Sequence, residues 1–280
     1  MTKSIDNAQD AAIESIGQKR ENIPSVTGMI AAVLKVVGVW LILFILNRSN
    51  IFHFPQPIKN LNSLVITIFA IYLIFFFLKK KKYSITKSLQ LNPVNMKIML
   101  VTLLLVLGIF AVRQGLNPIL YNLFPSKELI QIYLDSKPKT MLEWVHIIAS
   151  AILVAPVLEE LIFRGLMQKS LNEKYGLLIS IMVPAIIFSI IHIFPVAILS
   201  ILFSSVIYGL LVYKTQSVHA SIIAHAFHNL IALIYNSLFF KELPTDIKIS
   251  LFSSVFPILI GIGILIISFR YLGKSAKHIS

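Results

Sequence analysis

Stretches of apolar residues, each near the length of a membrane-spanning helix, follow one another along most of the chain. A transmembrane helix needs about 20 predominantly apolar residues to cross the hydrocarbon core. Inside lipid the backbone must satisfy its own hydrogen bonds, so repeated stretches of this length restrict the chain to a helical bundle. The sequence therefore predicts an all-α, polytopic membrane protein with about eight transmembrane helices. We expect them at about 28–46, 62–78, 96–113, 142–168, 177–194, 196–213, 217–239 and 250–271.

The composition supports this fold class and excludes several others. Hydrophobic residues make up 57% of the chain and charged residues only 13%, whereas soluble domains carry about 45–50% and 25%. The chain has no cysteine, which rules out disulfides and thiolate metal sites. The net charge of +13 comes from lysines that cluster beside the apolar stretches. That pattern predicts contact with membrane lipid headgroups and no nucleic-acid partner.

The chain divides into a polar tail at residues 1–27 and a transmembrane helical domain at 28–280, with no internal repeat. Basic residues, including the run Lys79–Lys82, are more numerous on one side of the predicted bundle. By the positive-inside rule we expect an integral cell-membrane protein with both termini in the cytosol. The segment 114–140 predicts a surface loop with a short interfacial helix. No feature of the sequence sets the oligomeric state.

The fourth apolar stretch contains three charged residues, Glu159, Glu160 and Arg164. A charge at membrane depth costs roughly 2.5 to 3.5 kcal/mol on insertion scales and marks a functional site by default. Glu160 and Arg164 are four residues apart, so they share a helix face and can pair, and a purely structural ion pair is the alternative interpretation. Glu159 is rotated by about 100° from Glu160. We therefore expect Glu159 to be the carboxylate left free for chemistry.

Two later stretches supply further polar residues: His192, His225, His228 and Asn229. His225 and Asn229 are four residues apart and project from one helix face. The helix rise places Glu159 about 15 Å and His225 about 16 Å from their nearest basic boundaries, so both lie at a similar depth. We expect His228 to face away from His225 and to pack or to make a supporting hydrogen bond. By itself, His192 is equally consistent with an interhelical hydrogen bond.

One carboxylate and two histidines around a cavity suit peptide hydrolysis by two different routes. In the first, Glu159 takes a proton from water, His192 orients that water or shares the general-base role, and His225 and Asn229 donate hydrogen bonds to the oxyanion. In the second, Glu159, His192 and His225 hold zinc, whose bound water is the nucleophile. The spacing of the residues leaves both routes open.

Three motifs together resemble the CAAX prenyl endopeptidase and bacteriocin-processing family, also called CPBP or Abi. Residues 159–164 (EELIFR) match its EExxxR motif, residues 188–192 (FSIIH) its FxxxH motif, and residues 225–229 (HAFHN) its HxxxN motif. The motifs occur in the family's order inside apolar stretches, and the resemblance covers about 140–240. EExxxR alone is a weak signal, whereas the ordered trio is specific.

The resemblance implies an eight-helix intramembrane protease that cleaves membrane-associated peptides or proteins. It implies that Glu159 and His192 activate water, that His225 and Asn229 form the oxyanion site, and that Glu160 and Arg164 support them. It also favours the route that requires no cofactor over the zinc route. Two rival functions remain: a non-catalytic bacteriocin-immunity or scaffold protein of the same fold, and a transporter. The absence of inverted repeats counts against a transporter.

Overall fold

The computed structural model describes residues 23–49, 51, 53–124, 137–192, 195–239 and 251–276, and these residues are almost entirely helical. The first four helices are α2 (Val26–Arg48), α3 (Gln56–Lys80), the short α4 (Ile85–Leu89) and α5 (Met96–Leu123). The motif-bearing part follows as α7 (Met141–Ile147), the π-helix η1 (Ile148–Val154), α8 (Ala155–Glu160), the π-helix η2 (Leu161–Gln168) and α9 (Lys169–Ile190). The last elements are α10 (Pro195–Thr215), α11 (Val218–Phe239), the π-helix η3 (Leu251–Val255) and α12 (Phe256–Ala276).

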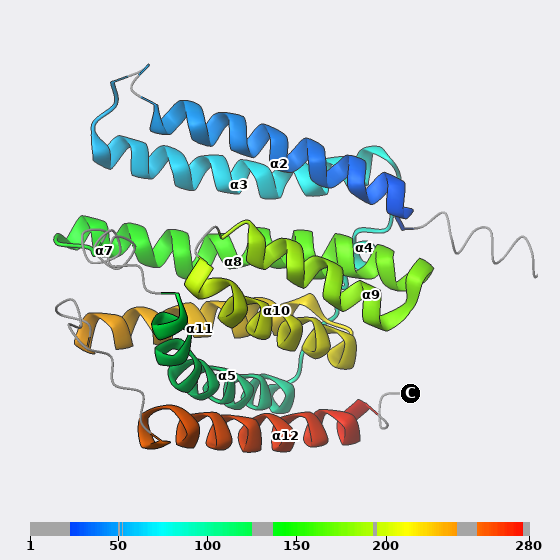
Figure 1. Ribbon diagram of the computed structural model, residues 1–280. Helices are drawn as coiled ribbons and strands as arrows, with labels where there is room; N and C mark the ends of the chain where they lie inside the picture. Colours follow the sequence, from blue (N-terminus) through cyan, green and yellow to red (C-terminus); the bar gives the residue numbers. More distant parts are fainter. Residues whose placement is uncertain are drawn as a thin grey trace, which may run out of the picture.

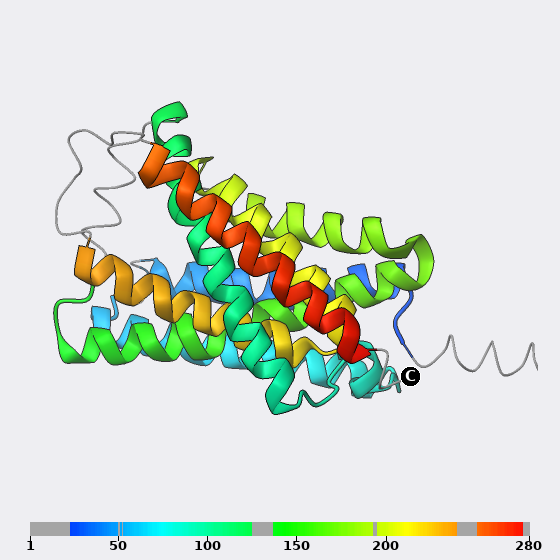
Figure 2. The same ribbon diagram turned by 90° about the horizontal axis from the view of Figure 1, so that it is seen from below.

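Seven helical stretches in the described part are long and apolar enough to cross a membrane. One of them, Met141–Ile190, has 50 residues. A straight helix of that length would extend about 75 Å, more than twice the hydrocarbon thickness. Gly176 interrupts it with φ +77° and ψ −176°, a conformation that glycine adopts without a steric penalty. The chain therefore turns back within α9 (Figures 1 and 2), and the stretch makes two crossings. The prediction of an all-α protein with about eight spans is confirmed.

The motif-bearing helices lie between the hairpin of α2 and α3 on one side and α12 on the other (Figure 1). In Figure 1 the hairpin of α2 and α3 covers one side of the α7–α9 layer, while α12 lies at the opposite side, beyond α5, α10 and α11. One hydrophobic core joins α2 and α3 to the helix that carries the glutamates, through residues such as Ile74, Leu78, Leu161 and Leu166. A second core joins α5, α10, α11 and α12. The polar residues of the three motifs lie between these two cores.

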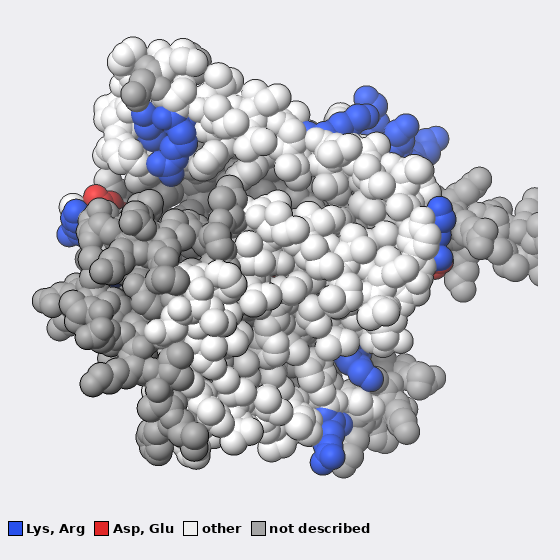
Figure 3. Space-filling model, viewed as in Figure 1, with Lys and Arg blue, Asp and Glu red and all other residues white. Residues whose placement is uncertain are grey.

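The surface has the charge distribution of a protein embedded in a bilayer. In Figure 3, lysine and arginine side chains gather near the two ends of the helices, and a broad uncharged band separates them. Large apolar side chains are exposed along this band, including Leu34, Leu178 and Ile267. A soluble protein would not expose so much contiguous apolar surface. This distribution agrees with an integral membrane protein, and the cytosolic placement of the termini remains a prediction.

The structure corrects the predicted boundary of the third span. α5 continues to Leu123, so the first ten residues of the expected loop at 114–140 are helical. Gln114, Asn117 and Pro118 suggested a loop, but Asn117 accepts a hydrogen bond from Ser200 of α10 (2.7 Å). A tertiary partner for Asn117 thus offsets the poor helix propensity of this segment. Residues 125–136 of the expected loop with its interfacial helix lie outside the described residues, as does the predicted tail up to residue 22.

α5 and α12 approach closely because glycines line their contact. A Cβ atom added at Gly261 would lie 2.6 Å from the carbonyl oxygen of Gly108 and 2.7 Å from the backbone nitrogen of Val112. Small residues of this kind allow membrane helices to pack backbone against backbone. Gly263, two residues along α12, would meet nothing within 4 Å.

This contact yields a matched pair of substitutions. We expect Gly261→Leu to separate α12 from α5 and to lower the free energy of unfolding by about 1–3 kcal/mol, the usual cost of overpacking. Gly263→Leu adds the same side chain to open space and should leave stability nearly unchanged. Thermal unfolding of the two purified variants measures the difference. Equal stability of the two variants would contradict the close contact.

Candidate active site

The two glutamates lie in one turn of α-helix between two π-helical segments. Pro156 begins this turn, near the start of α8. Proline has no backbone N–H, so the regular hydrogen-bond pattern cannot continue through it. Just before it, the N–H of Ala155 bonds to the carbonyl of Ser150, five residues earlier. Single π-helical turns of this kind widen a helix and often occur at functional sites. Here they change the direction in which Glu159 and Glu160 project relative to a regular helix.

Glu160 and Arg164 form a fully buried ion pair. The arginine donates to Glu160 Oε1 at 3.0 Å, and the two side chains are 0% and 1% exposed. Arg164 also donates to the hydroxyl and the carbonyl of Ser205 on α10, at 2.7 and 3.2 Å. Its guanidinium lies 5.0 Å from the ring centroid of Phe188 and 5.7 Å from that of Tyr208. Arg164 is thus fixed by contacts with Ser205, Phe188 and Tyr208, and through the ion pair it holds the carboxylate of Glu160 in one orientation.

His225 on α11 lies between the two glutamates. Its Nδ1 is 2.9 Å from Glu160 Oε1, and its Nε2 is 3.7 Å from Glu159 Oε2. Glu160 is ionised by its pairing with Arg164, so Nδ1 must carry the hydrogen that joins the ring to this carboxylate. Nε2 then faces Glu159 across a gap slightly longer than a direct hydrogen bond. The side chain of Glu159 is 29% exposed, so it is the accessible member of the pair.

His192 and His225 both contact the aromatic ring of Phe188. The centroid of Phe188 lies 4.6 Å from that of His192 and 5.9 Å from that of His225. His192 Nδ1 lies 2.7 Å from the carbonyl of Phe188. A carbonyl only accepts, so Nδ1–H donates and Nε2 is left available as an acceptor. Glu159 lies within electrostatic range of both imidazoles. The FxxxH and HxxxN segments are thus brought to the EExxxR helix.

Asn229 faces the same helix as His225. Its side-chain N–H donates to the carbonyl of Ala151 at 2.8 Å, one residue after Ser150 in η1. An amide group has two N–H donors, so one remains for another acceptor. Five of the six residues expected at the site lie in α8, η2 and α11, and His192 lies two residues after the end of α9 at Ile190.

The sequence analysis missed a second layer of polar contacts behind His225. The ring of Tyr208 stacks near that of His225 at 5.7 Å between centroids, and its hydroxyl lies 2.6 Å from His228 Nδ1. Arg113 lies 2.7 Å from His228 Nε2. Arginine can only donate, so Nε2 accepts and Nδ1–H donates to the oxygen of Tyr208. His228 thus makes the supporting hydrogen bonds that were one of its two predicted roles. Arg113, which seemed a boundary residue, lies inside α5.

The sequence analysis also left open a zinc site formed by Glu159, His192 and His225. Across the described ranges, no three side chains of the types His, Cys, Asp and Glu lie together as a group able to hold a metal ion. Nδ1 of His225 is engaged by Glu160 and Nδ1 of His192 by the carbonyl of Phe188, so each Nε2 is left available, as it also is in metal-ligating histidines. The choice between the route without a cofactor and the zinc route therefore stays a prediction.

The comparison with protein families agrees with the three motifs. The model for Rce1-like type II CAAX prenyl endopeptidases matches residues 141–231, which extend from the start of α7 into α11. This match confirms the resemblance to the CPBP family. No curated protein and no solved structure gave a match.

Proposed function

We propose that this chain, whose residues 141–231 match the model for Rce1-like type II CAAX prenyl endopeptidases, is an intramembrane endopeptidase. The observation that supports the proposal most directly is the different state of the two glutamates. Glu160 is buried and held by Arg164 and His225, whereas Glu159 is partly exposed beside the Nε2 atom of His225. One carboxylate therefore orients the imidazole, and the other is accessible to water and substrate.

In the proposed reaction, Glu159 takes a proton from a water molecule as the water oxygen attacks the scissile carbonyl. His192 Nε2 accepts a hydrogen bond from that water and orients it. The same proton then passes from Glu159 to the leaving amine as the C–N bond breaks. The reaction requires no cofactor. The proton that Glu159 takes from water is the one that it gives to the leaving amine, so Glu159 is regenerated as a carboxylate.

The oxyanion is stabilised in this proposal by His225 and Asn229. His225 donates to Glu160 from Nδ1, so a second donation from Nε2 requires the doubly protonated imidazolium. Glu159 and Glu160, one beside each ring nitrogen, balance the charge of that imidazolium. Asn229 supplies its second N–H. Such donors are most effective in a pocket shielded from bulk water. The substrate is proposed to be a membrane-associated or amphipathic peptide, such as a bacteriocin or pheromone precursor, or a membrane-protein segment.

The proposal is tested by reconstituting the purified protein in lipid vesicles with a quenched fluorescent peptide library. We expect cleavage by the wild type that persists in the presence of a strong chelator. Loss of cleavage on chelation, restored by added zinc, would replace the proposed route with the metal route. A biological output that survives both Glu159→Ala and His225→Ala would favour the scaffold function instead.

The oxyanion role leads to a separate prediction for Asn229. We expect Asn229→Ala to lower kcat about 10²- to 10³-fold with a small change in KM, because the lost N–H acts mainly on the transition state. Asn236→Ala removes the same amide from the same helix two turns later and serves as the control. Steady-state kinetics on a cleaved peptide gives both constants. A rise in KM at constant kcat would place Asn229 in substrate binding alone.

A further inference from the structure

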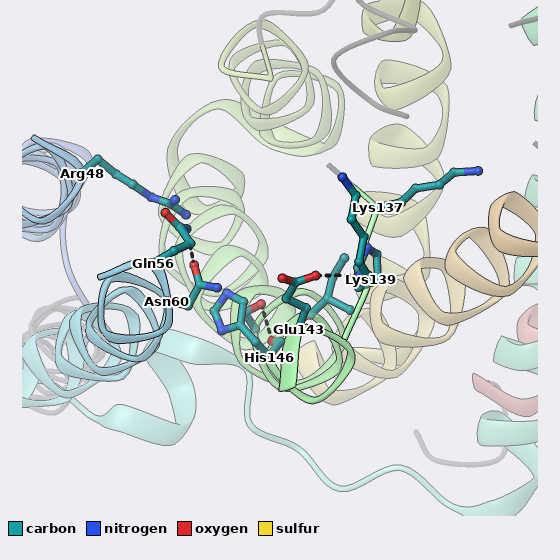
Figure 4. A pocket seen from close by; sticks show the side chains of 10 residues that line it. Arg48, Gln56, Asn60, Lys137, Lys139, Glu143 and His146 are labelled. Carbon is teal, nitrogen blue, oxygen red and sulfur yellow. Dashed lines mark hydrogen bonds between the residues drawn. The ribbon is translucent and has the colours of Figure 1, made fainter. Parts of the chain in front are cut away.

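A polar pocket of about 420 Å³ lies at the far end of the bundle from the Lys79–Lys82 run. It opens between the hairpin of α2 and α3 and the start of α7, as the close view in Figure 4 shows. Its lining consists of Arg48, Gln56, Asn60, Lys137, Pro138, Lys139, Glu143, His146, Ile147 and Ser150. None of these residues belongs to the three motifs, and the proposed reaction uses none of them.

The charges that line this pocket are mainly positive. Arg48, Lys137 and Lys139 are cationic, and Glu143 is the single carboxylate in the lining. That carboxylate is already engaged, because Glu143 Oε2 accepts from the backbone N–H of Lys139 (2.6 Å) and of Thr140 (3.4 Å). It therefore completes the N-terminal cap of α7, and with one carboxylate against three cations the lining keeps a net formal charge of +2.

Lys137 Nζ donates to the carbonyl of Asn236 at 3.3 Å, but other donors in the pocket lack an acceptor among the described residues. The guanidinium of Arg48 makes no hydrogen bond or ion pair with any described residue and contacts only the ring of Phe44, at 5.5 Å. Asn60 Oδ1 accepts a hydrogen bond from Gln56 at 2.8 Å. The N–H groups of Asn60 take no part in this bond and can donate to a ligand. Donors that gather in one cavity without acceptors suit an anion with several oxygens, because arginine and lysine bind phosphate strongly.

The position of the pocket indicates where such an anion comes from. Arg48 is the last residue of α2, Gln56 is the first of α3, and Lys139 lies just before α7. These helix ends mark the edge of the apolar band. Ile45 and Leu142 lie three residues farther into the band and Leu61 lies five, and these side chains are 57%, 61% and 59% exposed. A basic pocket at headgroup level, next to apolar surface for acyl chains, matches an anionic phospholipid.

We infer that this pocket is a binding site for the phosphate headgroup of an anionic membrane lipid. Arg48 and Lys139 bind the phosphate oxygens, and the amides of Gln56 and Asn60 bind the remaining headgroup oxygens. Trp144, next to the lining residue Glu143 in α7, serves as the fluorescent reporter of occupancy. Since Trp40 is the other of the two tryptophans in the chain, the variant Trp40→Phe isolates the signal of Trp144.

The test is a fluorescence titration of Trp40→Phe protein in uncharged detergent. Short-chain phosphatidic acid, short-chain phosphatidylcholine and inorganic phosphate are added separately. We expect a saturable change with the anionic lipid and little with the other two. Replacing both Arg48 and Lys139 by glutamine should weaken binding at least about tenfold. The control replaces Lys79 and Lys80 by glutamine at the opposite end of the bundle and should bind as the parent does.

Three outcomes would overturn the inference. Equal weakening in the control variant would show diffuse attraction to the protein's net charge. Equal affinity for phosphatidylcholine would show that the anion is not recognised. Inorganic phosphate binding as tightly as the lipid would assign the pocket to a soluble anion. None of these readouts depends on peptide cleavage, so the proposed endopeptidase and this site succeed or fail separately.

Discussion

Replacing Glu159 by glutamine is expected to reduce peptide cleavage by about 10²- to 10⁴-fold, the range that one general base contributes. The substitution keeps the size of the side chain and removes only its ability to take a proton. Glu159 is partly exposed and has one polar neighbour at 3.7 Å, so the fold should tolerate the change. We expect kcat to fall and the thermal stability to stay within a few degrees of wild type. Steady-state cleavage and thermal unfolding measure the two properties on the same preparation.

The matched control is Glu173→Gln, which removes an exposed carboxylate paired with Lys169 on the same helical stretch at 2.7 Å. Exposed pairs contribute little to stability, so this variant should cleave and unfold as the wild type does. Substantial activity in Glu159→Gln would rule out Glu159 as the general base. If activity is lost together with folding, the result would instead give Glu159 a structural role.

The second large effect is expected on stability, at the ion pair of Glu160 and Arg164. Replacing Arg164 by methionine leaves a fully buried carboxylate without its counter-ion. Removing one member of a buried pair typically costs about 3–5 kcal/mol. The loss should be at the upper part of this range, because Arg164 also bonds to Ser205 and lies against two aromatic rings. Unfolding by denaturant or by heat, measured in a fixed detergent, gives the free-energy difference.

A double variant separates the charge effect from the packing effect. Adding Glu160→Gln to Arg164→Met removes the stranded charge, so we expect part of the lost stability to return. The double variant should still be poorly active, because His225 loses the carboxylate that orients its ring at 2.9 Å. If the double variant is no more stable than Arg164→Met alone, then the pair acts through packing and not through charge.

Much of the fold was predictable because each helix that crosses a lipid bilayer needs about 20 predominantly apolar residues. The apolar stretches located all eight crossings, and the ends shifted mainly where polar residues found tertiary partners. Asn117 is the clearest case, since its bond to Ser200 depends on α10. No local pattern within residues 114–123 contains that information. Likewise, Pro156 indicates a break in the regular hydrogen-bond pattern, but helical periodicity does not reveal that π-helical segments lie on both sides of α8.

The candidate site was predictable at the level of residue identity but not of contacts. Helical spacing indicated that Glu160 pairs with Arg164, and the structure places them 3.0 Å apart. Spacing could not indicate that His225 bonds to Glu160 in addition to facing Glu159. Tyr208 was missed because a tyrosine within an apolar helix is common. Arg113 was missed because it is the last residue of the predicted span 96–113, where an arginine is also common. Their importance follows only from their contact with His228.

The ion pair of Glu160 and Arg164 forms within one helical stretch, whereas the imidazole of His225, which also bonds to Glu160, comes much later in the chain. Arg164 follows Glu160 by four residues, but His225 follows it by 65. During synthesis, the nascent helix can therefore neutralise Glu160 before α11 has left the ribosome. The cost of inserting two adjacent acids is reduced at that early stage, and His225 docks onto a carboxylate that is already oriented. In the proposed function, the site that cleaves the peptide is therefore complete only when the later helices have joined the bundle.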